Sequence, residues 1–296
     1  MDSRLLRYFV TVYDCQGISS AAERLHISQP AITRSIHNLE QDLGVELFER
    51  KPNGMIPTRY ADVLARRVRL MEMEYRHALA EIDSVRGGTQ GIIRIGAGPL
   101  WYSKILPKLI SSFQDEWPGV RIRLIGGVLN TLLPAMEAGK FDIMCASLDF
   151  PKRPGLVVEP LMHVKHSIIA SANHPEAKKL ISVPHDLAQS PWVVLADDDV
   201  GSSRIWSYFS SHGCRPPTIS VETSEPELIF DMVARGLHLA HVPDLLLRDR
   251  GTEGIVKLRI EGPFWETSAG LVYRSGETQL PYVKRFVEAI QELKLE

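Results

Sequence analysis

The stretch from residue 58 to residue 86 contains neither proline nor glycine, so nothing in it interrupts a helix. Its apolar residues recur at alternating steps of four and three, which is the heptad spacing of paired helices in a coiled coil. They are Leu64, Val68, Met71, Tyr75, Ala78, Ile82 and Val85. Such a helix is about 40 Å long. Its length and spacing favour a dimerisation helix that pairs with a second copy; the alternative is a seam packed against the chain's own domain.

The residues before this helix, 1–57, carry the signals of three shorter helices. Apolar residues at helical spacing indicate a first helix over residues 3–14: Leu5, Leu6, Phe9, Val10 and Tyr13. Ser20 and Glu23 have the spacing of a capping box, which predicts a second helix ending near Leu25. Ser28 is a suitable N-cap for the third, with Pro30 in its first turn.

The third helix has two distinct faces. Its predicted buried stripe is Ile32, Ile36, Leu39 and Leu43. Short polar side chains, glutamine, arginine and histidine lie on the opposite face, which includes Gln29 and Arg34. Glutamine can pair with adenine and arginine with guanine, so this arrangement indicates a helix-turn-helix whose exposed helix enters a major groove.

A β-hairpin is predicted after the third helix. Residues 45–48 form its first strand, Asn53-Gly54 is a strong turn signal, and residues 55–57 form the return strand. Arg50 and Lys51 would let this wing touch backbone phosphate. The whole chain has a formal net charge of −2, but residues 24–37 and 50–59 contain basic residues and no acid. These two segments together predict a local anion-binding face that the total charge hides.

The residues from Ser20 to Arg50 resemble the N-terminal signature of the LysR-type transcriptional regulators. The resemblance includes Ser28-Gln29-Pro30, Leu39-Glu40, Leu43-Gly44 and Leu47-Phe48, followed by Thr58. The chain departs from the family pattern at Thr33, where serine is usual, and at Ala61, where glycine is common. The resemblance implies a winged helix-turn-helix, a linker helix and a two-lobed effector domain of the periplasmic-binding-protein (type 2) kind. The residues expected to contact double-stranded operator DNA are Ser28, Gln29, Pro30, Thr33, Arg34, His37, Arg50, Lys51 and Thr58.

The C-terminal part follows a glycine-rich segment, residues 87–91, that we expect to act as a hinge. Beyond it, strand and helix signals alternate, which favours an α/β domain with a mostly parallel sheet covered by helices. Two successive α/β units, residues 92–161 and 162–264, predict two lobes. The resemblance implies that residues 265–296 return to complete the first lobe.

Ligands of such domains bind in the crevice at the carboxyl ends of the strands. The predicted effector-binding residues follow expected strand ends or lie near expected helix starts: Pro99, Leu100, Trp101, Ser103, Asn130, Ser147, Ser202, Thr223, Ser224 and Val242. Trp101 from one lobe and Thr223 from the other are expected to face each other, which suits a small organic molecule. The acidic run 197–199 is expected to be a solvated loop, and would disfavour a dianionic effector if it faced the cleft.

Catalytic and metal-binding signals are weak. The segment 96–101 lacks the third glycine of a dinucleotide fingerprint, and neither a Walker loop nor a nucleophile elbow occurs. His163 and His166, like His238 and His241, are three residues apart, which places them on opposite faces of a strand. The sequence therefore predicts no catalytic residue, no metal and no cofactor.

Targeting signals are also weak. The three cysteines are widely spaced, no apolar run approaches the roughly 18 residues of a membrane span, and no signal peptide is indicated. We therefore expect a cytoplasmic protein with no membrane partner. The predicted function is sequence-specific transcriptional regulation controlled by a small organic effector, with self-association as a dimer or tetramer and RNA polymerase as a further partner. The alternative is an α/β solute-binding or enzymatic protein whose N-terminal helices serve only in assembly.

Overall fold

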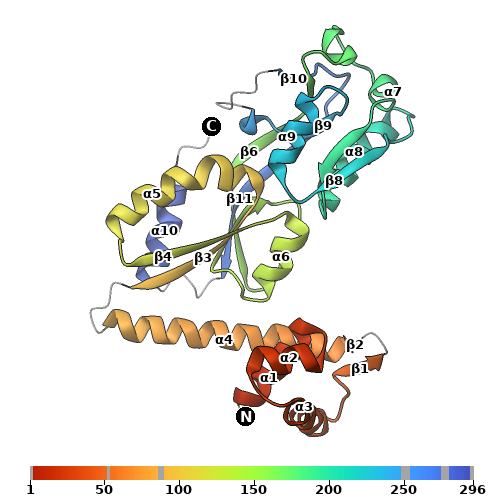
Figure 1. The fold of residues 1–296 in the computed structure, drawn as a ribbon. Helices are drawn as coiled ribbons and strands as arrows, with labels where there is room; N and C mark the ends of the chain where they lie inside the picture. The colour runs from red at the N-terminus through yellow and green to blue at the C-terminus, as the bar shows by residue number, and fades with distance from the viewer. Residues whose placement is uncertain (1–2, 52–53, 86–89, 248–253, 275–279, 294–296) are drawn as a thin grey trace. The chain divides into compact units, whose positions relative to one another are not determined.

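The computed structural model describes residues 3–51, 54–85, 90–247, 254–274 and 280–293 (Figure 1). Its contacts divide the chain into two compact units, residues 1–82 with 137–140, and residues 83–136 with 141–296. Each unit is described by itself. Asn53 of the predicted turn and most of the predicted hinge lie outside the described residues; the last hinge residue, Gly91, begins a strand.

Three helices pack together in the first unit: α1 (Ser3–Cys15), α2 (Ile18–Leu25) and α3 (Gln29–Leu43). Helix α2 begins after Gly17, so Ser20 and Glu23 lie inside the helix and the predicted capping box is wrong. The buried Ala21 and Ala22 lie on the inner face of α2, and His26 in a left-handed conformation ends the helix. This short turn allows α3 to follow directly, as the helix-turn-helix prediction requires.

The buried stripe of α3 is shorter than predicted. Ile32, Ile36 and Leu39 are buried, whereas Leu43 is 46% exposed. Leu43 is the last residue of α3, and Gly44 then turns the chain away with a φ of 69°. The stripe therefore ends before the helix does.

The predicted wing is present with shifted bounds. Strand β1 (Phe48–Lys51) pairs with the antiparallel β2 (Gly54–Pro57), and Lys51 lies opposite Gly54. The first strand begins three residues later than expected. The carboxylate of Glu40 explains the shift, because its Oε1 accepts the N–H of Leu47 at 2.8 Å and that of Phe48 at 3.2 Å.

The long helix α4 runs over Arg59–Val85, close to the predicted bounds. The residues of its predicted apolar seam differ in how far they are exposed. Val68 is 2% exposed inside the core of the first unit and Leu64 packs against that core, whereas Met71 is 50% and Tyr75 is 67% exposed. The prediction that the whole seam meets a partner is therefore wrong for Leu64 and Val68, because the helical head covers the start of the helix.

The second unit is built on a sheet that, within the described ranges, has seven strands in the order β10-β6-β11-β5-β3-β4, with β9 also paired to β6. The strands are β3 (Gly91–Ala97), β4 (Val120–Gly126), β5 (Ile143–Ser147), β6 (Leu156–Ser171), β9 (Ala240–Pro243), β10 (Ile255–Lys257) and β11 (Trp265–Arg274). Strands β7 (Trp192–Leu195) and β8 (Ile219–Thr223) form a separate parallel pair.

The expectation of a mostly parallel sheet is wrong. In the sheet, β3 pairs in parallel with β4 and β5, but β11 is antiparallel to both β5 and β6, and β6 is antiparallel to β9 and β10. The physical reason is the length of β6, which continues through residues 161 and 162 as one strand and pairs along most of its length with the antiparallel β11. Strand β6 thus crosses the predicted boundary between the lobes, and β11 pairs with residues of β6 on both sides of it; the lobe boundaries stay a prediction.

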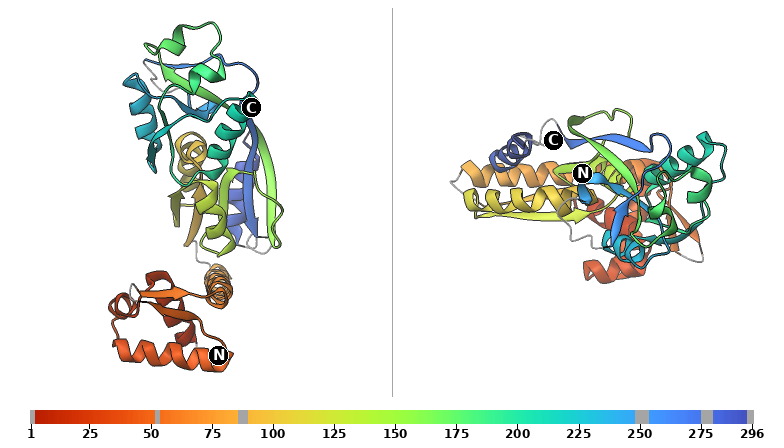
Figure 2. Two further views of the ribbon diagram at one scale, coloured as in Figure 1. Left: turned by 90° about the vertical axis from the view of Figure 1, so that its right-hand side faces the viewer. Right: turned by 90° about the horizontal axis from the view of Figure 1, so that it is seen from above.

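Helices flank both ends of this sheet (Figures 1 and 2). They are η1 (Trp101–Ile105), α5 (Leu106–Glu116), α6 (Leu129–Glu137), η2 (Pro175–Lys178), α7 (Pro184–Leu187), α8 (Asp199–Ser211), α9 (Pro226–Ala234), η3 (Asp244–Leu246) and α10 (Pro281–Gln291). No helix in the described ranges has both the length and the apolar character needed to cross a bilayer.

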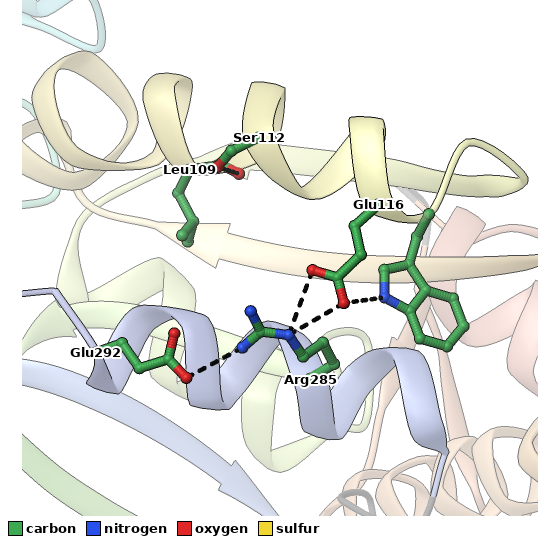
Figure 3. Close-up of polar contacts among 6 residues, drawn as sticks. Leu109, Ser112, Glu116, Arg285 and Glu292 are labelled. Atoms are coloured by element: carbon green, nitrogen blue, oxygen red, sulfur yellow. Dashed lines mark hydrogen bonds and ion pairs between the residues drawn. The ribbon is translucent and has the colours of Figure 1, made fainter.

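The last helix, α10, packs beside α5. Phe113 and Phe286 meet edge to face with ring centroids 4.9 Å apart. Arg285 donates from Nε to Glu116 at 3.2 Å and from a terminal nitrogen to Glu292 at 3.2 Å (Figure 3). The C-terminal segment therefore returns to the part of the sheet that begins with β3.

Candidate DNA-binding surface and effector cavity

The exposed face of α3 gathers most of the predicted DNA-contacting residues. Gln29, Pro30, Arg34 and His37 are exposed, while Ile32 on the same helix is fully buried. A surface hollow runs along this face and reaches Phe48 and Met55 of the wing. The burial of one side of α3 thus fixes which side chains are free to meet DNA.

The hydroxyl residues of the predicted set have local structural partners. Thr33 Oγ1 donates to the carbonyl of Gln29 at 3.0 Å. Thr58 Oγ1 donates to the carbonyl of Glu46 at 2.8 Å and accepts the N–H of Ala61, so it holds the start of α4. Ser28 is the N-cap residue of α3, although its side chain makes no capping hydrogen bond.

The basic residues of the wing lie on β1. Lys51 is exposed and lies 3.5 Å from the carboxylate of Glu49. Arg50 lies in the same strand, and its side chain is outside what the structure describes. Glu40 is part of the Leu39-Glu40 motif, but the sequence did not indicate its role: its two hydrogen bonds join α3 to the wing.

A cavity of about 110 Å³ lies in the second unit. It is lined by residues at or just after the ends of β3, β4, β5 and β7, by residues at the starts of α6, α8 and α9, and by side chains of β6, β9 and β11. These residues are Gly98, Pro99, Leu100, Trp101, Gly127, Val128, Leu129, Ala146, Ser147, Val164, His166, Leu195, Asp198, Val200, Pro226, Ile229, Phe230, His241, Val242, Pro243, Leu246, Trp265, Thr267 and Ala269. Its walls come from both predicted lobes. Most of these side chains are apolar, as is usual for a small-molecule site.

Half of the predicted effector set lines this cavity. These residues are Pro99, Leu100, Trp101, Ser147 and Val242. The others do not line it: Ser103, Asn130, Ser202, Thr223 and Ser224. Ser224 lines a neighbouring hollow with Tyr102. Ser103 lies within the π-helix η1.

The expected pairing of Trp101 with Thr223 is not found at the cavity. Thr223 is buried and its Oγ1 accepts the N–H of Glu225 at 3.0 Å, ahead of α9. Asn130 donates from Nδ2 to the carboxylate of Asp199, which joins α6 to α8. The side chains of Thr223 and Asn130, predicted to bind an effector, therefore already have hydrogen-bond partners within the chain.

Two histidines from different strands both line the cavity, although nothing in the sequence indicated that they lie near each other. His166 on β6 and His241 on the neighbouring antiparallel β9 have ring centroids 5.7 Å apart. Trp265 stacks on His166 and lies edge-on to His241 at 5.5 Å. Burial lowers the pKa of both histidines, and for His166 the nearby His241 lowers the pKa further, whereas for His241 the Asp198 carboxylate raises the pKa in part. Both rings are therefore neutral near pH 7.

The three aspartates of the acidic run 197–199 make different contacts. Asp198 lines the cavity, and its Oδ1 accepts the N–H of Gly201 at 3.0 Å as the N-cap of α8. Asp197 is exposed beside the neighbouring hollow, and Asp199 binds Asn130. The expected solvated loop is therefore wrong for Asp198, because capping the helix turns this carboxylate toward the interior.

Within the described ranges, no group of three or more histidine, cysteine or carboxylate side chains has a geometry that could hold a metal ion. Cys15, Cys145 and Cys214 are all free thiols. Because Cys145 is buried, the pKa of its thiol is raised, which disfavours the reactive thiolate.

Comparison with known families gives two matches. A model of the bacterial regulatory helix-turn-helix protein, lysR family, matches residues 3–62, and a model of the LysR substrate binding domain matches residues 86–294. The second match alone covers more than half of the chain.

Relatives match over most of their length. The chain is 27% identical over 290 residues to the uncharacterized HTH-type transcriptional regulator YybE of Bacillus subtilis, which covers 98% of each protein. It is 30% identical over 221 residues to the HTH-type transcriptional regulator PcaQ of Agrobacterium fabrum, covering 74% of this chain and 71% of that protein. Among solved structures, CbnR, a LysR family transcriptional regulator, has a TM-score of 0.66 at 22% identity, with 100% of both chains covered. CbnR complexed with its target DNA has a TM-score of 0.63 at 23% identity, covering 98% of this chain and 99% of that one.

A helix-turn-helix head with an exposed reading helix, followed by an α/β domain of the substrate-binding type, defines a DNA-binding transcriptional regulator with an effector domain. The chain belongs to the LysR family. This confirms the resemblance, the fold class and the prediction of a DNA-binding transcriptional regulator with an effector domain. The alternative of a solute-binding or enzymatic protein is wrong, since the matching families and relatives are transcriptional regulators rather than enzymes.

Proposed function

We propose that residues 1–57 recognise operator DNA, that α4 in the linker 58–86 pairs two copies, and that a small organic effector in the cavity of the second unit controls this binding. The observation that carries the proposal is the two-sided character of α3. Its apolar side is buried while Gln29, Arg34 and His37 are exposed together beside the wing. Side chains on such a face can reach base edges in a major groove.

The exposed part of the α4 seam supports the pairing of two copies. Met71, Tyr75, Ala78 and Ile82 are exposed at heptad spacing on one helix. Burial of such a seam against a second copy removes apolar surface from water and places two reading heads on two half-sites. Val85, the last member of the predicted seam, has a side chain outside what the structure describes.

The position of the cavity supports its role as the effector site. It lies where strands β3, β4, β5 and β7 end and where α8 and α9 begin, with walls from the predicted lobes 92–161 plus 265–296 and 162–264. A ligand that prefers one arrangement of the lobes shifts the population of that arrangement. The hinge 87–91 would pass this shift to the paired linker helices. RNA polymerase at the regulated promoter completes the set of partners, and a regulator of this kind works in the cytoplasm.

Operator binding tests the assignment of the reading head. DNA selected from a random pool by the wild-type chain provides the operator, and fluorescence anisotropy measures its affinity. Arg34→Ala is expected to weaken binding by about 1–3 kcal/mol and to relax the preference at one base position. The matched control is Arg121→Ala, which removes an exposed arginine from β4 in the other unit. Equal affinity of both variants and the wild type, with unchanged circular dichroism, would contradict the assignment.

A further inference from the structure

The size of the cavity limits what it can hold. Its volume is about 110 Å³, less than the roughly 150 Å³ of a cavity in another protein that holds benzene, so the size limits a ligand to at most one ring. Trp101 and Trp265 line it together with Phe230, so three flat aromatic rings form part of the wall. These walls suit a molecule with a single ring, whose faces can stack against them.

The charge of the lining is the second constraint. In the part of the chain that the structure describes, no lysine or arginine lines this cavity. Asp198 provides a carboxylate that is already held by the N–H of Gly201. His166 and His241 bring no positive charge near pH 7, because burial lowers the pKa of each ring, and for His241 it does so against the Asp198 carboxylate, which raises the pKa of that ring. A buried anion would therefore lose its hydration and meet a like charge without a counter-ion.

Buried polar atoms without a hydrogen-bond partner are the third feature that limits the kind of ligand. Within the described ranges, four buried nitrogen atoms of cavity-lining side chains have no hydrogen-bond partner: Trp101 Nε1, His166 Nδ1, His241 Nδ1 and Trp265 Nε1. Leaving such groups unpaired is costly, so their concentration around one cavity calls for an explanation. An indole N–H can only donate, and the matching ligand atom is an acceptor oxygen.

We propose that the effector is a small, uncharged, single-ring molecule that carries a hydroxyl or carbonyl oxygen, and that Asp198 excludes carboxylates of the same size. This inference rests on the proposed function, in which this cavity is the effector site. It goes further by assigning the charge and size class of the ligand. The aromatic walls hold the ring, and the histidine and tryptophan nitrogens provide partners for its oxygen.

Three probes of equal size and different charge test the proposal: benzyl alcohol, benzoate and benzylamine. Ligand-observed nuclear magnetic resonance measures the binding of each to the full chain. We expect benzyl alcohol to bind at least about tenfold more tightly than benzoate. In Asp198→Asn this preference is expected to shrink severalfold, since asparagine keeps the acceptor that caps α8 but removes the charge.

Two serine variants locate the binding. Ser147→Phe fills part of the cavity and is expected to weaken benzyl alcohol binding, while Ser207→Phe places the same side chain at an exposed position of α8 outside the lining. Operator binding without any probe checks that both variants fold. Tighter binding of benzoate or benzylamine than of benzyl alcohol overturns the proposed ligand class and leaves the cavity as the effector site. Binding of all three probes that survives Ser147→Phe, or no binding of benzyl alcohol at all, overturns the proposal. Neither result changes the operator affinity on which the DNA-reading assignment depends.

Discussion

His166 on β6 lies directly opposite Trp265 on the antiparallel β11, and their rings stack with centroids 3.6 Å apart and planes 26° apart. His241 reaches the same pair from β9, on the other side of β6. Three strands therefore build one aromatic wall of the cavity, and the sheet holds the rings in place. The wall combines a large apolar surface with two imidazoles whose pKa values burial lowers.

Acid is expected to destabilise the second unit. Burial lowers the pKa of His166 and His241 in the folded chain, whereas both titrate near their usual value of about 6.5 when the chain is unfolded. Below that pH the unfolded chain binds more protons than the folded one, so stability falls as the pH falls from about 6.5 toward the lowered folded values, and is unaffected above. Thermal unfolding at constant ionic strength should show this fall.

Two variants test whether His166 causes this fall in stability. His166→Phe keeps an aromatic ring against Trp265 and should reduce the fall in melting temperature below about pH 6.5, with His241 and His174 providing the remainder, since burial also lowers the pKa of His174. His163→Phe changes an exposed histidine on the same strand and serves as the control. Identical pH profiles for both variants and the wild type would refute this assignment.

Trp101 and Thr223 are expected to differ in their effect on sensing. Trp101 is 1% exposed and lines the cavity, so Trp101→Leu should raise the effector concentration needed for a half-maximal response by about tenfold or more. Thr223→Val removes the hydroxyl that accepts the N–H of Glu225. It should cost about 0.5–1.5 kcal/mol of stability and leave the response close to that of the wild type. Operator binding with and without the ligand compares them; a lost response in Thr223→Val alone would show that the cavity is not the sensing site.

The exposed half of the α4 seam is expected to hold the subunits together. Met71→Lys with Tyr75→Lys places two ammonium groups on that seam and should abolish both the dimer in sedimentation and high-affinity operator binding. Glu74→Lys changes the net charge by the same amount at an exposed position off the seam and should leave the dimer intact. A double variant that sediments as a dimer would show that this part of the seam packs elsewhere.

The wing should contribute affinity without sequence preference. Lys51→Ala removes an exposed cation from β1 and is expected to weaken binding to all DNA sequences alike. Arg50→Ala should do the same if its guanidinium reaches phosphate. Each variant should reduce the slope of log affinity against log salt by about one. A slope equal to that of the wild type, together with unchanged affinity for random DNA, would exclude a phosphate contact.

Local patterns in the sequence determined the reading head and the long helix. The period of Ile32, Ile36 and Leu39 identified the buried side of α3, and the absence of proline and glycine set α4 within a residue of its observed bounds. Both depend on contacts between residues a few positions apart, and helical spacing records such contacts directly. The signature around Ser28-Gln29-Pro30 then identified the family.

Only the tertiary structure decided how those patterns are used. The heptad spacing is the same along α4, yet the helical head buries Val68 and leaves Tyr75 exposed. The spacing of His163 and His166 correctly separated two faces of a strand, but no periodicity could show that His166 meets His241 and Trp265 from β9 and β11. Antiparallel pairing between strands some 75 to 100 residues apart brings them together (166 to 241 and 265), and that register is set by long-range packing rather than by neighbours in the chain.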